Sequence, residues 1–287
     1  MLSLLTTLLL LFWSATGVAQ STPNGRYQWV SDDPNLGGMS GIEMSDDGMS
    51  LVAVSDRGFL MRGTVVRDEN GLITDVNHSP IEPIKRADFT GVDVRGNTLD
   101  PEGVAIAQDG PIFVSFEGHH RVSAFEDVDA IEQLLPRHPD FDGMQSNSSL
   151  EALAIDDNGD LYTIPERSGR FDRPFPLYRF SDGVWDIPYV LPRAGSFLVV
   201  GADFGPDGML YVLERDFTGF SFLNRVRRVD LENGVSDTVL LAGGQFGNLE
   251  GISIWTTPSG EMMITMVADN NYNALLQTEI VEYLMTP

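Results

Sequence analysis

Short apolar runs separated by turns rich in Asp, Asn and Gly recur along this chain at nearly constant spacing. Three of the runs, at 101–106, 150–155 and 249–254, are almost the same sequence, and looser copies lie at 40–44 and 200–204. Counted on the small residue at 41, 103, 152, 201 and 251, the steps are 62, 49, 49 and 50 residues. A repeat of about 50 residues built from short strands is typical of a β-propeller.

Each repeat follows the same order of strand, turn and strand. The turns place Gly or Asn where the backbone must adopt positive φ, as in Asp157-Asn158-Gly159, which predicts hairpins. Helical periodicity occurs only at 128–135. Second strands are expected at 51–54, 112–116, 161–164, 210–213 and 262–266, third strands at 121–124, 177–180 and 225–229, and fourth strands at 185–191 and 236–241.

We therefore predict an all-β propeller with five blades from the five visible repeats, or six if additional strands complete another blade. A segment at 90–94 echoes the strand motif only 12 residues before Gly103, as a decayed repeat or an inserted hairpin would. Pairing of 27–31 with 280–285 in one blade would close the ring and remove exposed strand edges.

The N-terminal residues are typical of a secretory signal. An apolar run from Leu2 to Trp13 precedes the small residues Gly17-Val18-Ala19, which resemble a cleavage site, so residues 1–19 are predicted to be removed. The run is too short to span a bilayer. We expect residues 20–287 to form one propeller domain, a soluble and monomeric periplasmic or secreted protein without stable membrane insertion.

Charge and cysteine content narrow the classes of function. Asp and Glu number 42 against 18 Lys and Arg, a net charge of −24, which argues against nucleic acid and anionic lipid as partners and attracts divalent cations. The chain has no cysteine, which excludes a thiol nucleophile, an iron–sulfur centre and a Cys-based zinc site. A small-molecule substrate fits this surface better than a polyanion.

Carboxylates recur at two positions of the repeat, the opening of the first strand and the close of the second. These two positions lie at the same end of the central channel, because the first strand of a blade is innermost and the second runs antiparallel to it. The residues predicted to gather on this rim are Glu102, Glu151 and Glu250 from first strands, and Asp56, Glu117, Glu166, Glu214 and Asp269 from second strands.

Like charges at short range need compensation. Arg57, Arg121, Arg167 and Arg215 follow these carboxylates, and could pair with them or hold the oxygens of an anionic substrate. Alternatively, a hard cation, Ca²⁺, could bind Glu102, Glu151 and Glu250 together with Asp56 and Asp269, since carboxylate oxygens suit it. A third reading is purely structural: the glutamates accept hydrogen bonds from backbone N–H groups of neighbouring blades and lock the ring.

Residues that break the repeat are better candidates for catalysis than those that obey it. His119 and His120 follow Glu117 on the predicted rim, where a histidine can act as a general base. The predicted catalytic residues are His119, Glu117, Glu166 and Glu214. A solvated histidine pair in a loop is the alternative.

At these residues the chain resembles the phytase-like family, also described as "esterase-like activity of phytase". The resemblance implies an exported bacterial propeller that hydrolyses ester or phosphoester bonds, without established catalytic residues. Two other hydrolase motifs are missing, Arg-His-Gly-x-Arg and Gly-x-Ser-x-Gly. The resemblance rests on Gly38-Met39-Ser40-Gly41-Ile42, Ser55-Asp56-Arg57, Asp100-Pro101-Glu102-Gly103, Phe116-Glu117, Leu150-Glu151-Ala152, Pro165-Glu166-Arg167, Asp203 to Gly208, Leu213-Glu214-Arg215-Asp216-Phe217 and Asn248-Leu249-Glu250-Gly251.

Three functions fit these observations. The first is a Ca²⁺-assisted hydrolase acting on an ester or phosphomonoester at the carboxylate and arginine rim. The second is a propeller that binds a ligand or a protein without catalysis, because fold alone does not fix function. The third is a metal-dependent enzyme similar to propeller lactonases.

Overall fold

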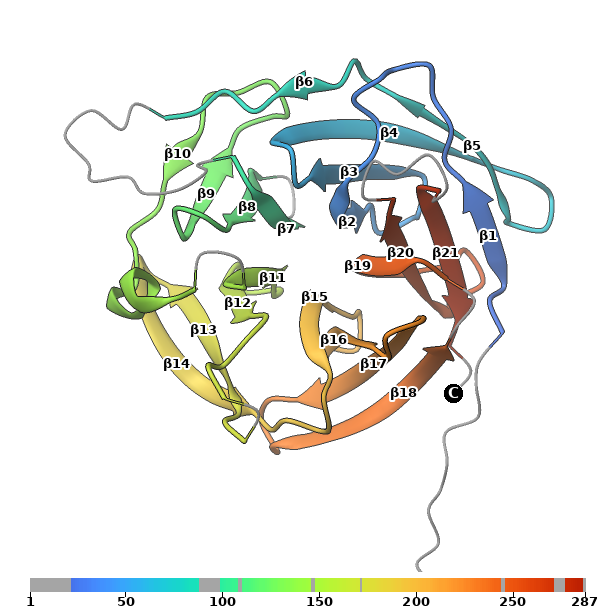
Figure 1. Cartoon of the computed structure of the whole chain (residues 1–287). Helices are drawn as coiled ribbons and strands as arrows, with labels where there is room; N and C mark the ends of the chain where they lie inside the picture. The colour runs from blue at the N-terminus through green and yellow to red at the C-terminus, as the bar shows by residue number, and fades with distance from the viewer. Residues whose placement is uncertain are drawn as a thin grey trace, which may run out of the picture.

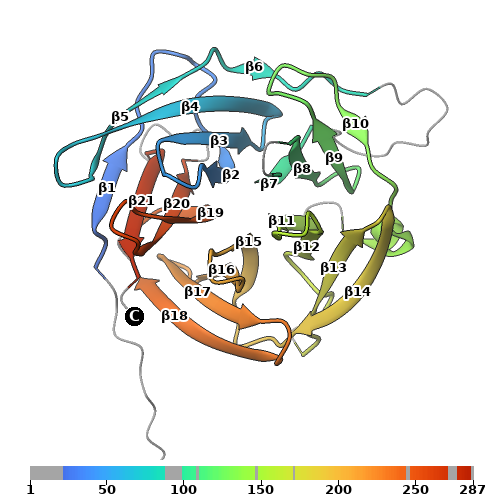
Figure 2. The same ribbon diagram turned by 180° about the vertical axis from the view of Figure 1, so that it is seen from behind.

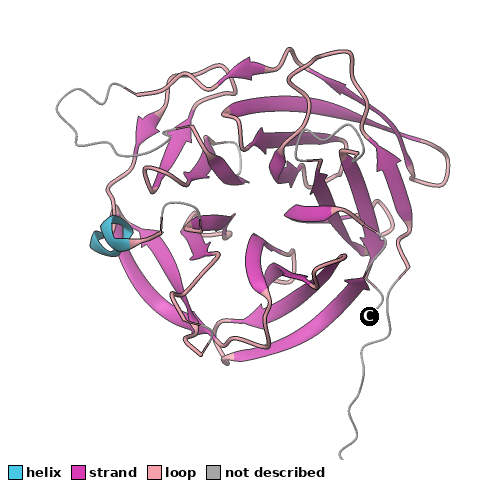
Figure 3. Cartoon of the chain, in the orientation of Figure 1, coloured by secondary structure: helices cyan, strands magenta, loops and turns pink. Residues whose placement is uncertain are grey.

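The computed structural model describes residues 22–87, 99–107, 110–145, 148–170, 172–243, 246–270 and 277–285. Within these residues the chain forms twenty-one β-strands and one short 3₁₀ helix, η1 (Pro139–Gly143), so the all-β prediction is confirmed (Figure 3). No helix in the described parts has the length and apolar character needed to cross a membrane. The predicted signal segment 1–19 and the motif echo at 90–94 lie outside the described residues.

The strands form five antiparallel sheets arranged as blades around a central axis (Figure 1). Blade one contains β2 (Met39–Met44), β3 (Ser50–Ser55), β4 (Phe59–Arg67), β5 (Ile73–His78) and β6 (Glu82–Pro83); blade two contains β7 (Pro101–Ile106), β8 (Ile112–Phe116), β9 (Arg121–Phe125) and β10 (Gln133–Leu134). Blade three contains β11 (Leu150–Ile155), β12 (Leu161–Pro165), β13 (Phe175–Ser181) and β14 (Val184–Leu191). Blade four contains β15 (Leu198–Phe204), β16 (Leu210–Phe217), β17 (Phe222–Asp230) and β18 (Val235–Gly243); blade five contains β19 (Asn248–Thr256), β20 (Met262–Asp269), β21 (Glu279–Leu284) and β1 (Gly25–Gln28).

The ends of the chain complete the fifth blade rather than a sixth. Strand β1 pairs antiparallel with β21, with Gly25 opposite Glu282 and Gln28 opposite Glu279. The two strands lie side by side in both views of the ring (Figures 1 and 2). The predicted pairing of the two chain ends is therefore confirmed, and the blade count is five.

The prediction of a helix at 128–135 was wrong. This segment contains turns and the two-residue strand β10, which pairs with β9 at the outer edge of blade two. Glu132 is 3% exposed, and its carboxylate accepts hydrogen bonds from Arg121 and Ser123. These tertiary contacts, followed by Pro136, override a short helical pattern that has little stability of its own.

Apolar side chains fill the interfaces between blades. The buried residues divide into five hydrophobic clusters, and each cluster joins two neighbouring blades. The cluster between blades one and two, for example, contains Val54 of β3 and Phe116 of β8. A single blade therefore buries its faces only against its neighbours, which fixes the ring as one unit.

The small residue that marks every repeat is explained by the approach of the innermost strands. A Cβ on Gly41 would lie 2.7 Å from the carbonyl oxygen of Glu102 in the next blade, and one on Gly201 would lie 2.6 Å from the carbonyl oxygen of Glu250. Gly103 and Gly251 make equally close approaches to neighbouring backbone. Of the five repeat positions, only the third has a residue with a methyl group, Ala152.

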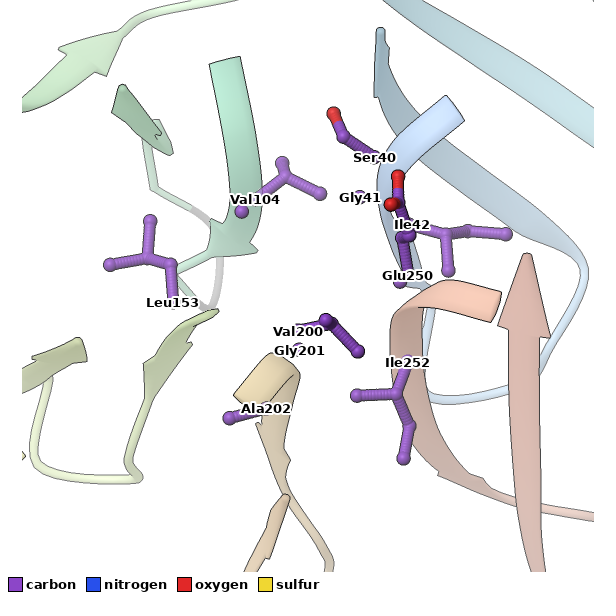
Figure 4. A pocket seen from close by; sticks show the side chains of 12 residues that line it. Ser40, Gly41, Ile42, Val104, Leu153, Val200, Gly201, Ala202, Glu250 and Ile252 are labelled. Carbon is purple, nitrogen blue, oxygen red and sulfur yellow. The ribbon is translucent and has the colours of Figure 1, made fainter. Parts of the chain in front are cut away.

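The axis of the ring is nearly closed at this level. The space between the five innermost strands has a volume of only about 10 Å³. Its lining is mostly aliphatic, and Ser40 and Glu250 are the labelled side chains that carry oxygen (Figure 4). A cavity of this size holds at most about one water, so a ligand reaches the polar rim from one face of the propeller and does not pass through the ring.

Candidate functional site

The register of the inner strands places the two recurrent carboxylate positions at one end of the ring, as predicted. Leu150, which opens β11, is opposite Pro165 at the close of β12, and Leu249 of β19 is opposite Ala268 of β20. In every blade the pairing of the innermost strand with the second strand is irregular next to this point. The residue at the irregularity is Ser40, Glu102, Glu151, Val200 or Glu250, one in each blade. Bulges redirect a side chain, so the same device presents one side chain per blade at the rim.

Seven of the eight predicted carboxylates form one electrostatically linked group, together with an acidic residue that the sequence argument had not selected. The additional residue is Asp100, whose charge acts on Asp56, Glu102 and Glu117. We call this group the carboxylate ring. Its members are Asp56, Asp100, Glu102, Glu117, Glu151, Glu166, Glu250 and Asp269.

Asp100 could have been found from the sequence. It stands two residues before Glu102 in Asp100-Pro101-Glu102. Residues i and i+2 point to the same face of a strand. Asp100 is absent from the recurring carboxylates because the other repeats have no acidic residue at its position. The corresponding residues are Gly38, Ser149, Leu198 and Asn248.

The tightest part of the carboxylate ring lies in blade two. One carboxylate oxygen each from Asp100, Glu102 and Glu117 lie within 4.8 Å of one another. Three carboxyl groups this close supply up to six oxygen atoms, and Ca²⁺ takes six to eight. The charge of Glu250 acts on Glu102, and the charge of Glu102 acts on Glu151. Further carboxylate oxygens therefore lie nearby.

Burial raises the pKa values of six members of the ring, Asp56, Asp100, Glu102, Glu117, Glu151 and Glu250. The pKa of Glu102 lies well above its ordinary value because of burial and the charges of Glu250, Glu117, Asp100 and Asp56. Burial and Asp269 raise the pKa of Asp56 to about 6. For Glu250, burial raises the pKa to about 7 even though Arg215 opposes the shift. The ring thus carries more negative charge than the residues around it balance.

Glu117 and Glu151 come from neighbouring blades and their side chains interact directly. Burial together with the neighbouring charges of Glu102 and Glu117 raises the pKa of Glu151 well above its ordinary value. Glu117 Oε1 also accepts a hydrogen bond of 2.6 Å from the backbone N–H of Ser149 in blade three. This last contact is of the inter-blade kind expected for structural locking, so Glu117 belongs to both readings.

Arg215 is the guanidinium most deeply engaged with the ring. It donates through Nη1 to Glu250 Oε1 and Asn248 Oδ1, and through Nη2 to Glu166 Oε1 at 3.3 Å. Burial lowers its pKa, but attraction to Glu250, Glu151 and Glu166 outweighs burial and raises the pKa overall. Arg215 thus bridges Glu250 and Glu166.

Arg167 lies at the edge of the ring and Arg57 beside it. Arg167 Nε donates to Glu166 Oε2 at 3.1 Å and to Ser148 Oγ at 3.0 Å, and 44% of its side chain is exposed. Arg57 is exposed, and its charge acts on Asp56. Both guanidinium groups are accessible to an anionic ligand at the rim.

Arg121 takes a structural position rather than a place at the rim. Its guanidinium is 1% exposed, donates to Glu132 Oε1 at 2.6 Å and stacks 3.8 Å from the centre of the Phe116 ring. His119 lies on the same outer side. Burial and the charges of Arg137 and Arg121 lower its pKa. The neighbouring His120 bonds through Nδ1 to Ser149 Oγ at 2.7 Å.

Glu214 is also separate from the carboxylate ring, because the strand register places it one position before the rim. Glu214 is opposite Val199, as Phe116 is opposite Pro101 in blade two. The rim position that Glu117 and Glu166 hold in blades two and three is therefore held by Arg215 in blade four.

The Glu214 carboxylate is completely buried and accepts hydrogen bonds from Arg225 Nε at 2.6 Å and from Arg227 at 2.8 and 2.5 Å. Both arginines belong to β17 of the same blade. The charge of Glu214 is therefore compensated within blade four.

The donor atoms of the carboxylate ring suit a hard divalent cation. They are oxygen atoms, with the Asn248 amide oxygen nearby, and oxygen ligands favour Ca²⁺ or Mg²⁺ over softer metals. Asp56 Oδ1 is buried and accepts no hydrogen bond from the residues that the structure describes. An orphaned buried carboxylate oxygen costs free energy unless a cation or a proton compensates it.

Comparisons with known proteins agree with this architecture. Residues 34–272 match the family model described as "Phytase-like: Esterase-like activity of phytase". No curated protein matches the chain. Among solved structures, a calcium-binding protein, regucalcin, from Agrobacterium tumefaciens is similar in fold, with a TM-score of 0.52 and 8% identity over 92% of this chain and 96% of that one. A gluconolactonase from Xanthomonas campestris has a TM-score of 0.47 and 13% identity over 86% and 72% of the two chains.

Proposed function

Because the chain belongs to the phytase-like family, we propose that it is a hydrolase of an ester or phosphomonoester, assisted by Ca²⁺ at the carboxylate ring. The observation that carries this proposal is the imbalance of charge in the ring. Among the residues that the structure describes, three arginines, Arg215, Arg167 and Arg57, act on the eight carboxylates. The pKa values of Glu102 and Glu151 are raised well above normal by burial and by their neighbours.

Each residue of the ring has a part in this proposal. Asp100, Glu102 and Glu117 would hold the cation, with Glu250 and Asp56 beside them. A bound Ca²⁺ would polarise a carbonyl or phosphoryl oxygen. The Glu151 carboxyl group, whose pKa is raised well above its ordinary value, would donate a proton to the leaving group as water attacks the carbonyl carbon or the phosphorus. Arg215 and Arg167 orient the anionic oxygens of the substrate.

The proposal also accounts for the acidic surface. A protein of net charge −24 repels an anionic phosphoester at long range. A divalent cation at the ring reverses the local sign where the substrate reacts. The two arginines at its edge extend the same positive region toward solvent.

The test is calorimetric titration of the purified metal-free protein with Ca²⁺, comparing wild type with Glu102→Gln. We expect saturable binding by wild type that falls at least about 100-fold in affinity in the variant, a loss of about 2.7 kcal/mol. The matched control is Glu232→Gln, because Glu232 is exposed in a turn of blade four. The metal-free Glu102→Gln protein should be at least as stable as wild type, since the substitution removes one of several repelling charges.

Catalysis is measured on p-nitrophenyl acetate, p-nitrophenyl phosphate and a γ-lactone, each with Ca²⁺ and with EDTA. Ca²⁺-dependent turnover of the ester or the phosphate supports the proposal, and turnover of the lactone alone assigns the lactonase alternative. Ca²⁺ binding without turnover of any of the three assigns a binding propeller. If wild type binds no Ca²⁺ and Glu102→Gln is less stable than wild type, the glutamates serve to lock the ring.

A further inference from the structure

Ser149 lies between three glutamates of the carboxylate ring and is hydrogen-bonded to each of them. Its backbone N–H donates to Glu117 Oε1 at 2.6 Å. Its carbonyl oxygen accepts from the backbone N–H of Glu151 at 3.0 Å and from that of Glu166 at 2.8 Å. Ser149 thus fixes the side chain of Glu117 and the backbone of the other two glutamates, so a shift of this one residue would change the geometry of all three.

One of these bonds recurs in the ring, whereas the contact of the Ser149 side chain breaks the repeat. Gly38 and Asp100 hold the position of Ser149 in blades one and two, and their carbonyl oxygens accept from the rim residues of their own blades at 2.9 and 2.8 Å. Ser149 Oγ, in contrast, lies 2.7 Å from Nδ1 of His120, one of four histidines in the chain. His120 belongs to the turn between β8 and β9, so this bond joins blade two to blade three.

The His120 side chain is held from two further sides. It is 6% exposed, and the carbonyl oxygen of this residue accepts a hydrogen bond of 2.7 Å from Arg137 Nε. The imidazole also makes a hydrogen bond to the backbone of Met144. Arg137 and Met144 lie on either side of η1. The η1 segment and the turn of blade two therefore fix the imidazole in its orientation toward Ser149.

Burial excludes direct contact of this pair with a substrate. A serine bonded to a histidine is the arrangement of an activated nucleophile. A nucleophile must reach the reacting carbon or phosphorus, however, and Ser149 is 0% exposed. The pair therefore acts through the residues that Ser149 holds.

We infer that His120 is a positioning residue of the carboxylate ring, which acts through the Ser149 hydroxyl to keep Glu117, Glu151 and Glu166 in the arrangement that binds the cation. The binding of Ca²⁺ is the part of this inference that rests on the proposed function. Loss of a partner that orients metal ligands typically weakens metal binding by about 10–100-fold. Substitution of His120 removes no carboxylate from the ring, so its effect reports on geometry.

The positioning is tested first without metal, by the proton chemical shift of the Ser149 amide in EDTA-treated protein. A short hydrogen bond from an N–H group to a carboxylate moves the proton signal downfield, so we expect a downfield signal in wild type and an upfield shift in His120→Leu. His120→Asn keeps a hydrogen-bonding group near the place of Nδ1 and should restore the signal. Neither variant has an aromatic ring at this position, so the loss of the ring itself cannot explain a difference between them.

His78→Leu is the matched control. His78 Nε2 also lies 2.7 Å from a serine hydroxyl, that of Ser31, but His78 is on the outer strand β5 of blade one. This variant should leave the Ser149 amide signal unchanged. An amide signal in His120→Leu that matches wild type would overturn the inference.

The second measurement is calorimetric titration with Ca²⁺. We expect an affinity about tenfold or more weaker in His120→Leu, and an affinity close to that of wild type in His120→Asn and His78→Leu. Ser149→Ala guards against a folding defect, because it removes the same bond by deleting one oxygen atom. It should weaken binding as His120→Leu does, and the double variant should bind no more weakly than either single one.

The two measurements separate this inference from the proposed function. Equal Ca²⁺ affinities of wild type and Ser149→Ala would overturn the positioning role. Wild type that binds no Ca²⁺, together with an amide signal that moves in His120→Leu, would contradict the proposed function and leave the positioning of the carboxylates by His120 standing.

Discussion

Glu214 and Glu117 lie one repeat position apart near the close of the second strand, and their charges are compensated in opposite ways. Glu214 is buried between Arg225 and Arg227, and both of its oxygens are hydrogen-bonded to guanidinium groups. Glu117 is also buried, yet the charged groups that act on it are other carboxylates. The difference comes from the register: in blade four Arg215 takes the rim position of Glu117, and Glu214 bonds to arginines of the third strand instead.

This difference separates two explanations that recurrence alone could not separate. A carboxylate whose own blade supplies two arginines stabilises that blade, and a ligand would add nothing to it. A carboxylate crowded by Asp100, Glu102 and Glu151 makes the protein less stable unless a proton or a cation compensates it. Blade four thus uses Glu214 for structure and places Arg215 at the rim, whereas blades two and three place Glu117 and Glu166 there.

The largest effect is expected from breaking the compensated site. Glu214→Gln leaves Arg225 and Arg227 buried without a counter-charge, and removal of one partner of a buried ion pair costs about 3–5 kcal/mol. We expect a loss of this size in the free energy of unfolding, measured by urea denaturation. Glu232→Gln, an exposed change in the same blade, should stay within about 0.5 kcal/mol of wild type. If Glu214→Gln is as stable as wild type, the ion pairs of Glu214 with Arg225 and Arg227 do not stabilise the fold.

An intermediate effect is expected at a contact between two blades that involves no charged side chain. The Cβ of Gly201→Ala would lie 2.6 Å from the backbone oxygen of Glu250, so blades four and five must separate. Overpacking of this kind costs about 1–3 kcal/mol. Gly143→Ala is the control, because nothing lies within 4 Å of its added Cβ. Equal stability of the two variants would show that the inner strands can shift apart freely.

The smallest effect, when measured over a single pH unit, is expected in the pH dependence of the metal-free protein. The pKa of Glu250 is raised to about 7 by burial, so between its unfolded value and pH 7 the folded protein binds the additional proton and loses stability as the pH rises. This group contributes about 1.4 kcal/mol for each pH unit in that window. Urea denaturation in EDTA at several pH values should give a flatter profile for Glu250→Gln than for wild type.

The comparison between the two profiles matters more than either slope. Burial lowers the pKa of His119 and of His120, which opposes the carboxylates in the same pH range, but this contribution cancels in the difference. Saturating Ca²⁺ should reduce the difference, because cation binding requires the ionised carboxylate. Identical profiles for wild type and Glu250→Gln would contradict the raised pKa.

The architecture was predictable from the sequence because a propeller repeats one unit. The spacing of Gly41, Gly103 and Gly201 reflects the close approach of neighbouring inner strands, which leaves no room for a side chain. That constraint acts in nearly every blade and so produces a periodic signal. The helix expected at 128–135 failed for the complementary reason, since its conformation depends on the contact of Glu132 with Arg121 in one blade only.

The site was predictable only where it follows the repeat. Antiparallel pairing determined that the strand openings and closings share one end, which brought Glu102, Glu151 and Glu250 together. The partners of Glu214 were beyond that argument, because Arg225 and Arg227 lie on the third strand and their side-chain directions depend on its register. Arg121 and His119 were placed at the rim by sequence proximity to Glu117, whereas the turn carries them to the outer side of blade two.

The pairing of β1 with β21 has a consequence for how this molecule is assembled. Arg26 and Glu279 form an ion pair across 253 positions of the chain, so the first blade-forming strand has no sheet partner until the last one has been made. Contacts so distant in sequence are formed late and slowly. During synthesis the four earlier blades form an open arc with an uncovered edge at each end. The carboxylate ring, whose members come from both sides of that gap, is therefore assembled only when the circle closes.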